Sequence, residues 1–293
     1  MTSPGVADVP AWFTTAVTVP PEQHTATVDG IPIAYRAWGD PAARGIVLVH
    51  GGAAHSRWWD HIAPLLTSGW RVIAPDLSGH GDSGRRPRYS LDIWARELLG
   101  VVTDAGITSP VVIGHSMGGF VTLRMATLFG SRIAGAVAID SPVRDIAPED
   151  AAARQRRAFG PLRVYPTRAE AMARFRPIPD QPVLRYIAEY VAAASIRPVE
   201  GGWTWKFDPR IFVRDEFTPT LLTRLDCRVA LFRAEHGIVS EQLGEVMYDR
   251  LGRVAPLVEI PVAGHHIMLD QPIALVSALR TLLADWNHSI PQG

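Results

Sequence analysis

The stretch "IGHSMGG", residues 113–119, decides the fold because it holds a serine inside a G-x-S-x-G motif. The short apolar run 110–115 predicts a buried strand before the serine, and residues 117–130 have the period of a helix after it. A serine at such a strand-to-helix turn stands exposed above the end of the strand. The first N–H groups of the helix are free to stabilise an oxyanion. We therefore predict Ser116 as a nucleophile and the Met117 amide as an oxyanion donor.

On both sides of this motif, short apolar runs alternate with segments of helical period. The predicted strands are 45–50, 71–77, 110–115, 133–140, 228–234 and 256–262, and the predicted helices are 57–69, 90–106, 117–130, 240–251 and 272–286. Such alternation is typical of a parallel sheet with helices on both faces. Ahead of it, residues 25–30 and 31–40 alternate in polarity and meet at Asp29-Gly30, which predicts a hairpin.

The alternation breaks between residues 143 and 220. Helical pieces at 149–160, 168–176 and 183–195, separated by prolines, precede a tryptophan-rich piece at 201–212. We interpret the whole stretch as a helical cap inserted into the core. The predicted organisation is an N-terminal arm (1–22), a core (23–142 and 221–293) and the cap (143–220).

Composition excludes several classes of function. The 293 residues are 47% apolar and carry a formal net charge of zero, so neither nucleic acid nor a charged membrane surface is expected as a partner. A single cysteine, Cys227, excludes an intrachain disulfide and a cysteine-ligated zinc site. No signal peptide or membrane-spanning run is evident, so we expect a cytoplasmic protein.

A serine nucleophile needs a base and an oxyanion hole. The loop "VAGHHIML" (262–269) follows the last predicted strand, and loops at the carboxyl ends of parallel strands meet at one edge of the sheet. We predict His265 as the base, with His266 as the alternative that more naturally packs or lines the pocket. The glycine-rich loop after the first parallel strand offers a second oxyanion donor, the amide of Gly52 or, alternatively, of Ala53.

These motifs carry a resemblance to a known family. The order "HGG" (50–52), "DLSGHGDSG" (76–84), "GHSMGG" (114–119) and "AGHH…DQP" (263–272) resembles the α/β-hydrolase fold superfamily, especially its capped serine esterase, lactonase and carbon–carbon hydrolase branch. The resemblance covers roughly residues 25–286. It implies an eight-stranded, mostly parallel sheet, a lid after the sixth strand, a Ser–His–acid triad and no cofactor. Related epoxide hydrolases and haloalkane dehalogenases carry an aspartate nucleophile, so Ser116 argues against both chemistries.

The acid of this implied triad departs from the usual pattern. Members of the superfamily commonly place it shortly after the seventh strand, where this chain has Gly237 in "RAEHGIV". Asp140 ends the sixth predicted strand in "AVAIDSP", a position that some members use for the acid. Glu235 lies two positions before the usual site. We predict Asp140 as the acid and keep Glu235 as the alternative.

The motifs therefore predict a serine hydrolase that cleaves a small carboxylic ester or lactone through an acyl-enzyme. The same site could serve a carbon–carbon bond hydrolase or a cofactor-free perhydrolase, and the missing acid at Gly237 leaves room for an inactive ligand-binding protein. We expect His115, Trp58 and His266 to contact the substrate. No histidine pair has metal-ligand spacing backed by a carboxylate, so we predict no metal site. The sequence indicates no oligomeric state.

Overall fold

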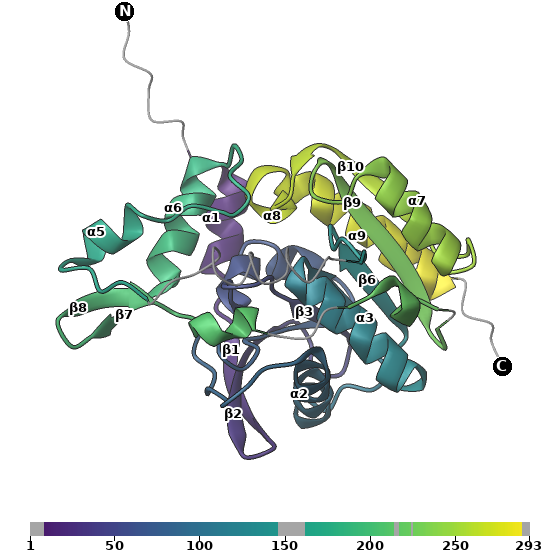
Figure 1. The fold of residues 1–293 in the computed structure, drawn as a ribbon, viewed down its shortest axis with the longest axis horizontal. Helices are drawn as coiled ribbons and strands as arrows, with labels where there is room; N and C mark the ends of the chain where they lie inside the picture. The colour runs from purple at the N-terminus through teal and green to yellow at the C-terminus, as the bar shows by residue number, and fades with distance from the viewer. Residues whose placement is uncertain (1–8, 146–161, 214–216, 224, 289–293) are drawn as a thin grey trace, which may run out of the picture.

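An eight-stranded sheet forms the centre of the protein. The computed structural model describes residues 9–145, 162–213, 217–223 and 225–288 (Figure 1). The strand order is β1-β2-β4-β3-β5-β6-β9-β10, and pairing is parallel from β4 through to β10, with β1 and β2 antiparallel at one edge. The bounds are β1 Glu22–Val28, β2 Ile31–Trp38, β3 Arg44–Val49, β4 Trp70–Pro75, β5 Val111–His115, β6 Gly135–Ile139, β9 Arg228–His236 and β10 Leu257–Gly264. The predicted eight-stranded, mostly parallel sheet is confirmed.

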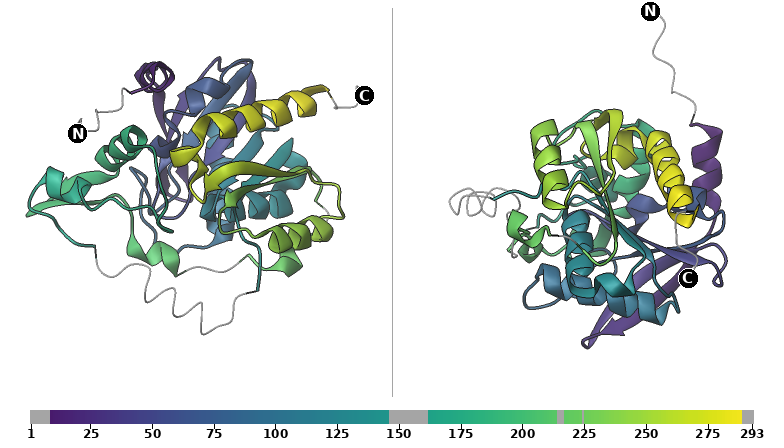
Figure 2. Two further views of the ribbon diagram at one scale, coloured as in Figure 1. Left: turned by 90° about the horizontal axis from the view of Figure 1, so that it is seen from above. Right: turned by 90° about the vertical axis from the view of Figure 1, so that its right-hand side faces the viewer.

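Helices cover both faces of this sheet (Figure 2). The α2, α3 and α7 helices pack on one face, and α1, α8 and α9 pack on the other. Their bounds are α1 Ala11–Thr18, α2 Leu91–Asp104, α3 Met117–Phe129, α7 Glu241–Arg250, α8 Ile267–Asp270 and α9 Pro272–His288. Side chains of β3 alternate between the two cores, with Val47 facing the first and Ile46 and Leu48 facing the second. This alternation explains why the central strands are apolar throughout.

The predicted hairpin is present, and one predicted helix is wrong. Asp29 and Gly30 both have positive φ, as the tight turn between β1 and β2 requires. The helix predicted over 57–69 is instead two short 3₁₀ helices, η1 (Ser56–Trp59) and η2 (Ala63–Leu66). Pro64 lies inside η2 and lacks the N–H that an α-helix would need there. The proline therefore interrupts the predicted α-helix.

The chain between β6 and β9 adds no strand to the main sheet in the residues that the structure describes. Its elements are α5 Arg168–Met172, α6 Arg185–Ala194, a hairpin of β7 Ile196–Val199 and β8 Gly202–Trp205, and the 3₁₀ helices η4 Pro209–Phe212 and η5 Pro219–Leu221. The helix predicted at 149–160 lies outside the described residues. The α5 helix and the hairpin project to one side of the body (Figure 1).

The N-terminal helix α1 also packs against the body of the protein. It lies beside η2, and its Phe13 is buried against Tyr186 and Tyr190 of α6. None of the helices within the described ranges is long and apolar enough to cross a membrane.

Candidate active site

Ser116 occupies a strained turn between β5 and α3. Its backbone has φ 54° and ψ −117°, a conformation that costs free energy for any residue with a side chain. The glycines after it are required by close packing, because a Cβ on Gly118 would overlap the His50 carbonyl oxygen and one on Gly119 would overlap the Ser141 hydroxyl. The motif thus holds the serine at the carboxyl end of β5, facing the loops of neighbouring strands.

A chain of two hydrogen bonds links the three residues predicted as nucleophile, base and acid. Ser116 Oγ lies 3.0 Å from His265 Nε2, and His265 Nδ1 lies 2.7 Å from Asp140 Oδ2. Both His265 and Asp140 are almost completely buried. Because Asp140 accepts the proton on Nδ1, the lone pair of Nε2 faces the serine hydroxyl.

Asp140 is held from several directions by the end of β9 and the start of the loop after it. Its carboxylate accepts the N–H of Ile238 at 2.9 Å and those of Ala234 and Val239 at 3.3 Å each. These donors satisfy the oxygens of the buried carboxylate and fix its position. Gly237 is essential to this arrangement, since a Cβ at that position would overlap both carboxylate oxygens of Asp140. The glycine at position 237 therefore makes room for the carboxylate of Asp140, the residue that directly follows β6.

Glu235, the alternative acid, is placed elsewhere. Its carboxylate accepts the N–H of Val262 at 2.7 Å, and its side chain is 41% exposed. Both ring nitrogens of His265 are already occupied by Ser116 and Asp140. Glu235 thus ties β9 to β10 rather than orienting the histidine.

The two predicted oxyanion donors lie next to each other. Met117 is the first residue of α3, where a backbone N–H has no partner inside the helix. A Cβ on Gly52 would lie 3.7 Å from Met117 Sδ and 3.4 Å from Phe212 Cε1, so this glycine lies between the helix start and η4. Ala53, the alternative donor, has a positive φ of 57°.

The three residues predicted to contact substrate, His115, Trp58 and His266, form a cluster next to His265. His115 donates from Nε2 to the carbonyl oxygen of His265 at 2.9 Å, and His266 donates from Nε2 to that of Ile178 at 3.1 Å. Trp58 packs on His266 with ring centroids 5.5 Å apart. Burial, together with the neighbouring His265, lowers the pKa of His266 to about 3 and lowers the pKa of His115 well below its ordinary value. Both rings are therefore neutral at pH 7.

Other histidines near the site have structural contacts. His50 donates to the Gly51 carbonyl and accepts the N–H of Leu77. His55 contacts the Ser195 hydroxyl at 2.8 Å, but that hydroxyl donates to the Val191 carbonyl at 2.7 Å. The proton of Ser195 therefore points away from His55, the reverse of what a nucleophile and base require.

Gln181 and Asp270 were missed by sequence reasoning, and they hold the backbone on both sides of His265. Gln181 Oε1 accepts the N–H of His266 at 2.7 Å, and Asp270 Oδ2 accepts that of Gly264 at 2.6 Å. Gln181 Nε2 also donates to Asp270 Oδ2 at 2.9 Å, which closes the arrangement into a clamp. Gln181 lies 84 positions before His265 in a proline-rich stretch, and no motif marks it.

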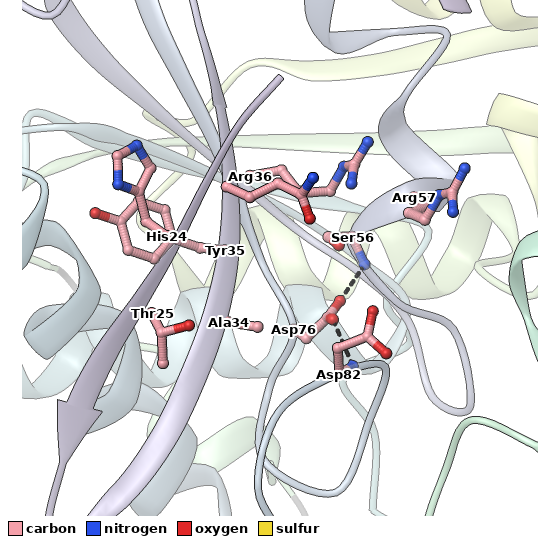
Figure 3. Close-up of a pocket in the computed structure, with 10 residues that line it drawn as sticks. His24, Thr25, Ala34, Tyr35, Arg36, Ser56, Arg57, Asp76 and Asp82 are labelled. Carbon is pink, nitrogen blue, oxygen red and sulfur yellow. Dashed lines mark hydrogen bonds between the residues drawn. The ribbon is translucent and has the colours of Figure 1, made fainter. Parts of the chain in front are cut away.

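A polar pocket lies apart from these residues, around the edge formed by β1 and β2 (Figure 3). Its centre is Asp76, whose carboxylate accepts the N–H of Ser56 at 2.6 Å and that of Asp82 at 2.8 Å. It is lined by Gln23, His24, Thr25, Ala34, Tyr35, Arg36, Ser56, Arg57, Asp76 and Asp82. The aspartate is saturated by backbone donors that shape the loop, so we assign this pocket a structural role.

A nucleophile turn on a mostly parallel sheet, with a histidine after its last strand, defines a hydrolase of the α/β class. Comparison with known proteins supports the same class. The model of the alpha/beta hydrolase family matches residues 46–279. An esterase of Mycobacterium tuberculosis is 26% identical over 255 residues, which cover 84% of each chain.

Two further similarities extend over most of the chain. A lipase of the same organism is 26% identical over 268 residues, covering 86% of this chain and 98% of the lipase. The solved structure of a hypothetical protein from Pseudomonas aeruginosa aligns with a TM-score of 0.75 and 25% identity, covering 91% and 99% of the two chains. The chain belongs to the alpha/beta hydrolase family and is a hydrolase.

Proposed function

We propose that the protein is a serine hydrolase that cleaves a small carboxylic ester or lactone through an acyl-enzyme. The observation that carries this proposal is the continuous hydrogen-bond chain from Asp140 through His265 to Ser116. Serine alone is a weak nucleophile and needs a base whose tautomer is fixed. The hydrogen bonds between Asp140 and His265 and between His265 and Ser116 supply such a base. The similarity to proteins named as an esterase and a lipase supports an ester as the substrate class.

The proposed reaction has two halves. His265 Nε2 takes the proton of Ser116 Oγ as the oxygen attacks the substrate carbonyl carbon. The resulting oxyanion accepts hydrogen bonds from the amides of Met117 and Gly52. When the tetrahedral intermediate collapses, the imidazolium gives its proton to the leaving alcohol. Water, deprotonated by His265, then attacks the acyl-enzyme and releases the carboxylic acid and the free serine.

Asp140 stabilises the imidazolium that forms in each half of this reaction. Backbone N–H groups from the end of β9 and from the loop after it hydrogen-bond to its carboxylate and hold it against His265. We also propose that residues 143–220 act as a cap over the site. The contact of Phe175 with Trp58, with ring centroids 5.9 Å apart, and the approach of Phe212 to Gly52 support that role.

Three variants test the proposal with a short-chain chromogenic ester. Ser116→Ala should abolish turnover and prevent covalent labelling by a fluorophosphonate. Asp140→Asn should lower kcat by about 10⁴-fold, because the histidine then adopts the wrong tautomer. Glu235→Gln is the matched control, and it should change kcat by less than about tenfold because its carboxylate accepts the Val262 N–H and lies outside the hydrogen-bond chain of Asp140, His265 and Ser116.

The outcomes separate the alternatives. If wild-type protein neither turns over esters nor labels at Ser116, the serine hydrolase mechanism is wrong, and an inactive binding protein becomes the better account. If Glu235→Gln loses activity while Asp140→Asn retains it, the nucleophile stands but the acid is misassigned.

A further inference from the structure

Three histidines, one at the end of β5 and two in the turn between β10 and α8, form a compact cluster at the candidate active site. A ring nitrogen of each of His115, His265 and His266 lies within 4.8 Å of the others, and all three side chains are buried. The ring centroids are 4.7 Å apart for His115 and His265, 5.4 Å for His115 and His266, and 4.7 Å for His265 and His266. Only His265 has a role in the proposed ester hydrolysis that needs its imidazole.

Each of these rings already donates one N–H to an oxygen. The acceptors are the His265 carbonyl for His115, the Ile178 carbonyl for His266 and the Asp140 carboxylate for His265. The remaining nitrogens are therefore the Nδ1 atoms of His115 and His266 and Nε2 of His265, each with a lone pair. Histidines that bind metal ions in proteins show the same pattern, in which the second nitrogen donates to a carbonyl or carboxylate.

His266 provides an independent sign that something binds here. Its side chain is 8% exposed, and its buried Nδ1 has no hydrogen-bond partner among the described residues. A buried polar atom without a partner costs about 1–3 kcal/mol, so such an atom is usually satisfied by a water, an ion or a ligand.

We propose that His115, His265 and His266 bind a divalent transition-metal ion, with Zn²⁺ as the representative case. Imidazole nitrogens suit zinc, copper and nickel, whereas magnesium and calcium require oxygen ligands. Zinc–nitrogen bonds of about 2.0–2.1 Å place tetrahedral ligands roughly 3.3 Å apart, so the rings must move together by about an ångström. Ser116 Oγ, 3.0 Å from His265 Nε2, stands where a fourth ligand would bind.

Occupancy of this cluster should inhibit the enzyme. An ion on His265 Nε2 uses the lone pair that would take the serine proton, so Ser116 loses its base. The inhibition rests on the proposed serine hydrolase mechanism, but binding of the ion does not. Zinc binding and ester hydrolysis can therefore be tested separately.

The first experiment measures Zn²⁺ binding to the metal-free full chain by competition with a chromogenic chelator. We expect one ion per chain and a Kd at least about tenfold weaker in His266→Asn and in His115→Asn. His236→Asn, which removes an exposed imidazole on β9, is the matched control and should bind as wild type does. Mg²⁺ should not compete. Binding of less than one ion per chain, or equal affinity in His266→Asn and wild type, would overturn the proposal.

A second experiment uses wild-type protein alone and so does not depend on the folding of a variant. One equivalent of Zn²⁺ should block fluorophosphonate labelling of Ser116, and EDTA should restore it. Labelling that continues at saturating Zn²⁺ would show that the ion does not reach His265. A protein that binds zinc but never labels, with or without EDTA, would contradict the serine hydrolase mechanism and leave the metal site standing.

Discussion

At the scale of single residues, Gly237 leaves no room for a larger residue, because the carboxylate of Asp140 fills the space that a side chain would need. Gly237→Ala removes none of the proposed catalytic groups, yet it must displace Asp140 or the loop after β9. We expect kcat/KM for ester hydrolysis to fall by about 100-fold, the typical effect of moving a positioning group by an ångström. Steady-state kinetics on the variant measure this.

Gly244→Ala is the control for this substitution. The nearest atoms to a Cβ there are Leu257 methyl groups at 3.5 Å, an ordinary contact, and alanine favours the helix. Gly244→Ala should keep full activity. Wild-type kinetics in Gly237→Ala would mean that Asp140 does not need its present position.

Much of the site could be predicted from residues that lie next to a strand end. Ser116 is marked by its glycines, and His265 and Asp140 each follow an apolar strand directly, so the topology brings them to one edge of the sheet. The positions that depend on distant contacts could not be predicted. The overlap between Gly237 and Asp140 joins residues 97 positions apart, and nothing local to either residue signals it.

At the scale of elements, the turn from β10 into α8 carries His265. The clamp that fixes this turn joins Gln181, from the segment before α6, to Asp270 at the end of α8. Gln181→Ala leaves the His266 amide without its acceptor and frees the loop. We expect the free energy of unfolding to fall by about 1–3 kcal/mol. We also expect kcat to fall by about tenfold with little change in KM. Urea denaturation and ester kinetics measure the two effects.

Gln271→Ala serves as the comparison for this change, because the Gln271 side chain is bonded only weakly, at 3.4 Å, to the Val262 carbonyl. It should resemble wild type in both measurements. If Gln181→Ala is destabilised but keeps its kcat, the clamp is structural only and does not position the base.

The central strands could be predicted from the sequence, whereas the backbone of residues 57–69 could not. The rhythm of apolar runs predicts every central strand because burial on both faces leaves a strong signal. The stretch 57–69 has apolar residues at helical spacing, but its backbone forms two 3₁₀ turns. Pro64 lacks the N–H that an α-helix needs there, and the spacing of apolar side chains does not reflect that missing donor.

At the scale of the whole molecule, buried histidines should make the fold sensitive to acid. His50, His55, His61, His80, His115 and His266 are all buried, and burial lowers the pKa of each. The unfolded chain takes up protons on these rings near pH 6.5, whereas the folded chain takes them up only at lower pH. Their contribution to stability is therefore complete above pH 6.5 and is lost as the pH falls below it.

His61 isolates this effect in a ring that takes no part in the proposed reaction. It is fully buried, hydrogen-bonds through Nε2 to the Met268 carbonyl at 2.7 Å, and has its pKa lowered by burial to about 4. A shift from 6.5 to about 4 removes about 2 kcal/mol of stability between pH 7 and pH 5. His61→Gln cannot be protonated, so its free energy of unfolding should fall by about 2 kcal/mol less than that of wild type over this range.

Urea denaturation at pH 7, 6 and 5 provides the measurement, and the quantity to compare is the slope of the unfolding free energy against pH. Comparing slopes makes the test independent of the stability that His61→Gln loses at every pH through altered packing. His236→Gln, which removes an exposed imidazole, should follow the wild-type slope. Parallel curves for wild type and His61→Gln would mean that His61 takes up its proton in the folded protein as readily as in the unfolded chain, and acid sensitivity would then have another origin.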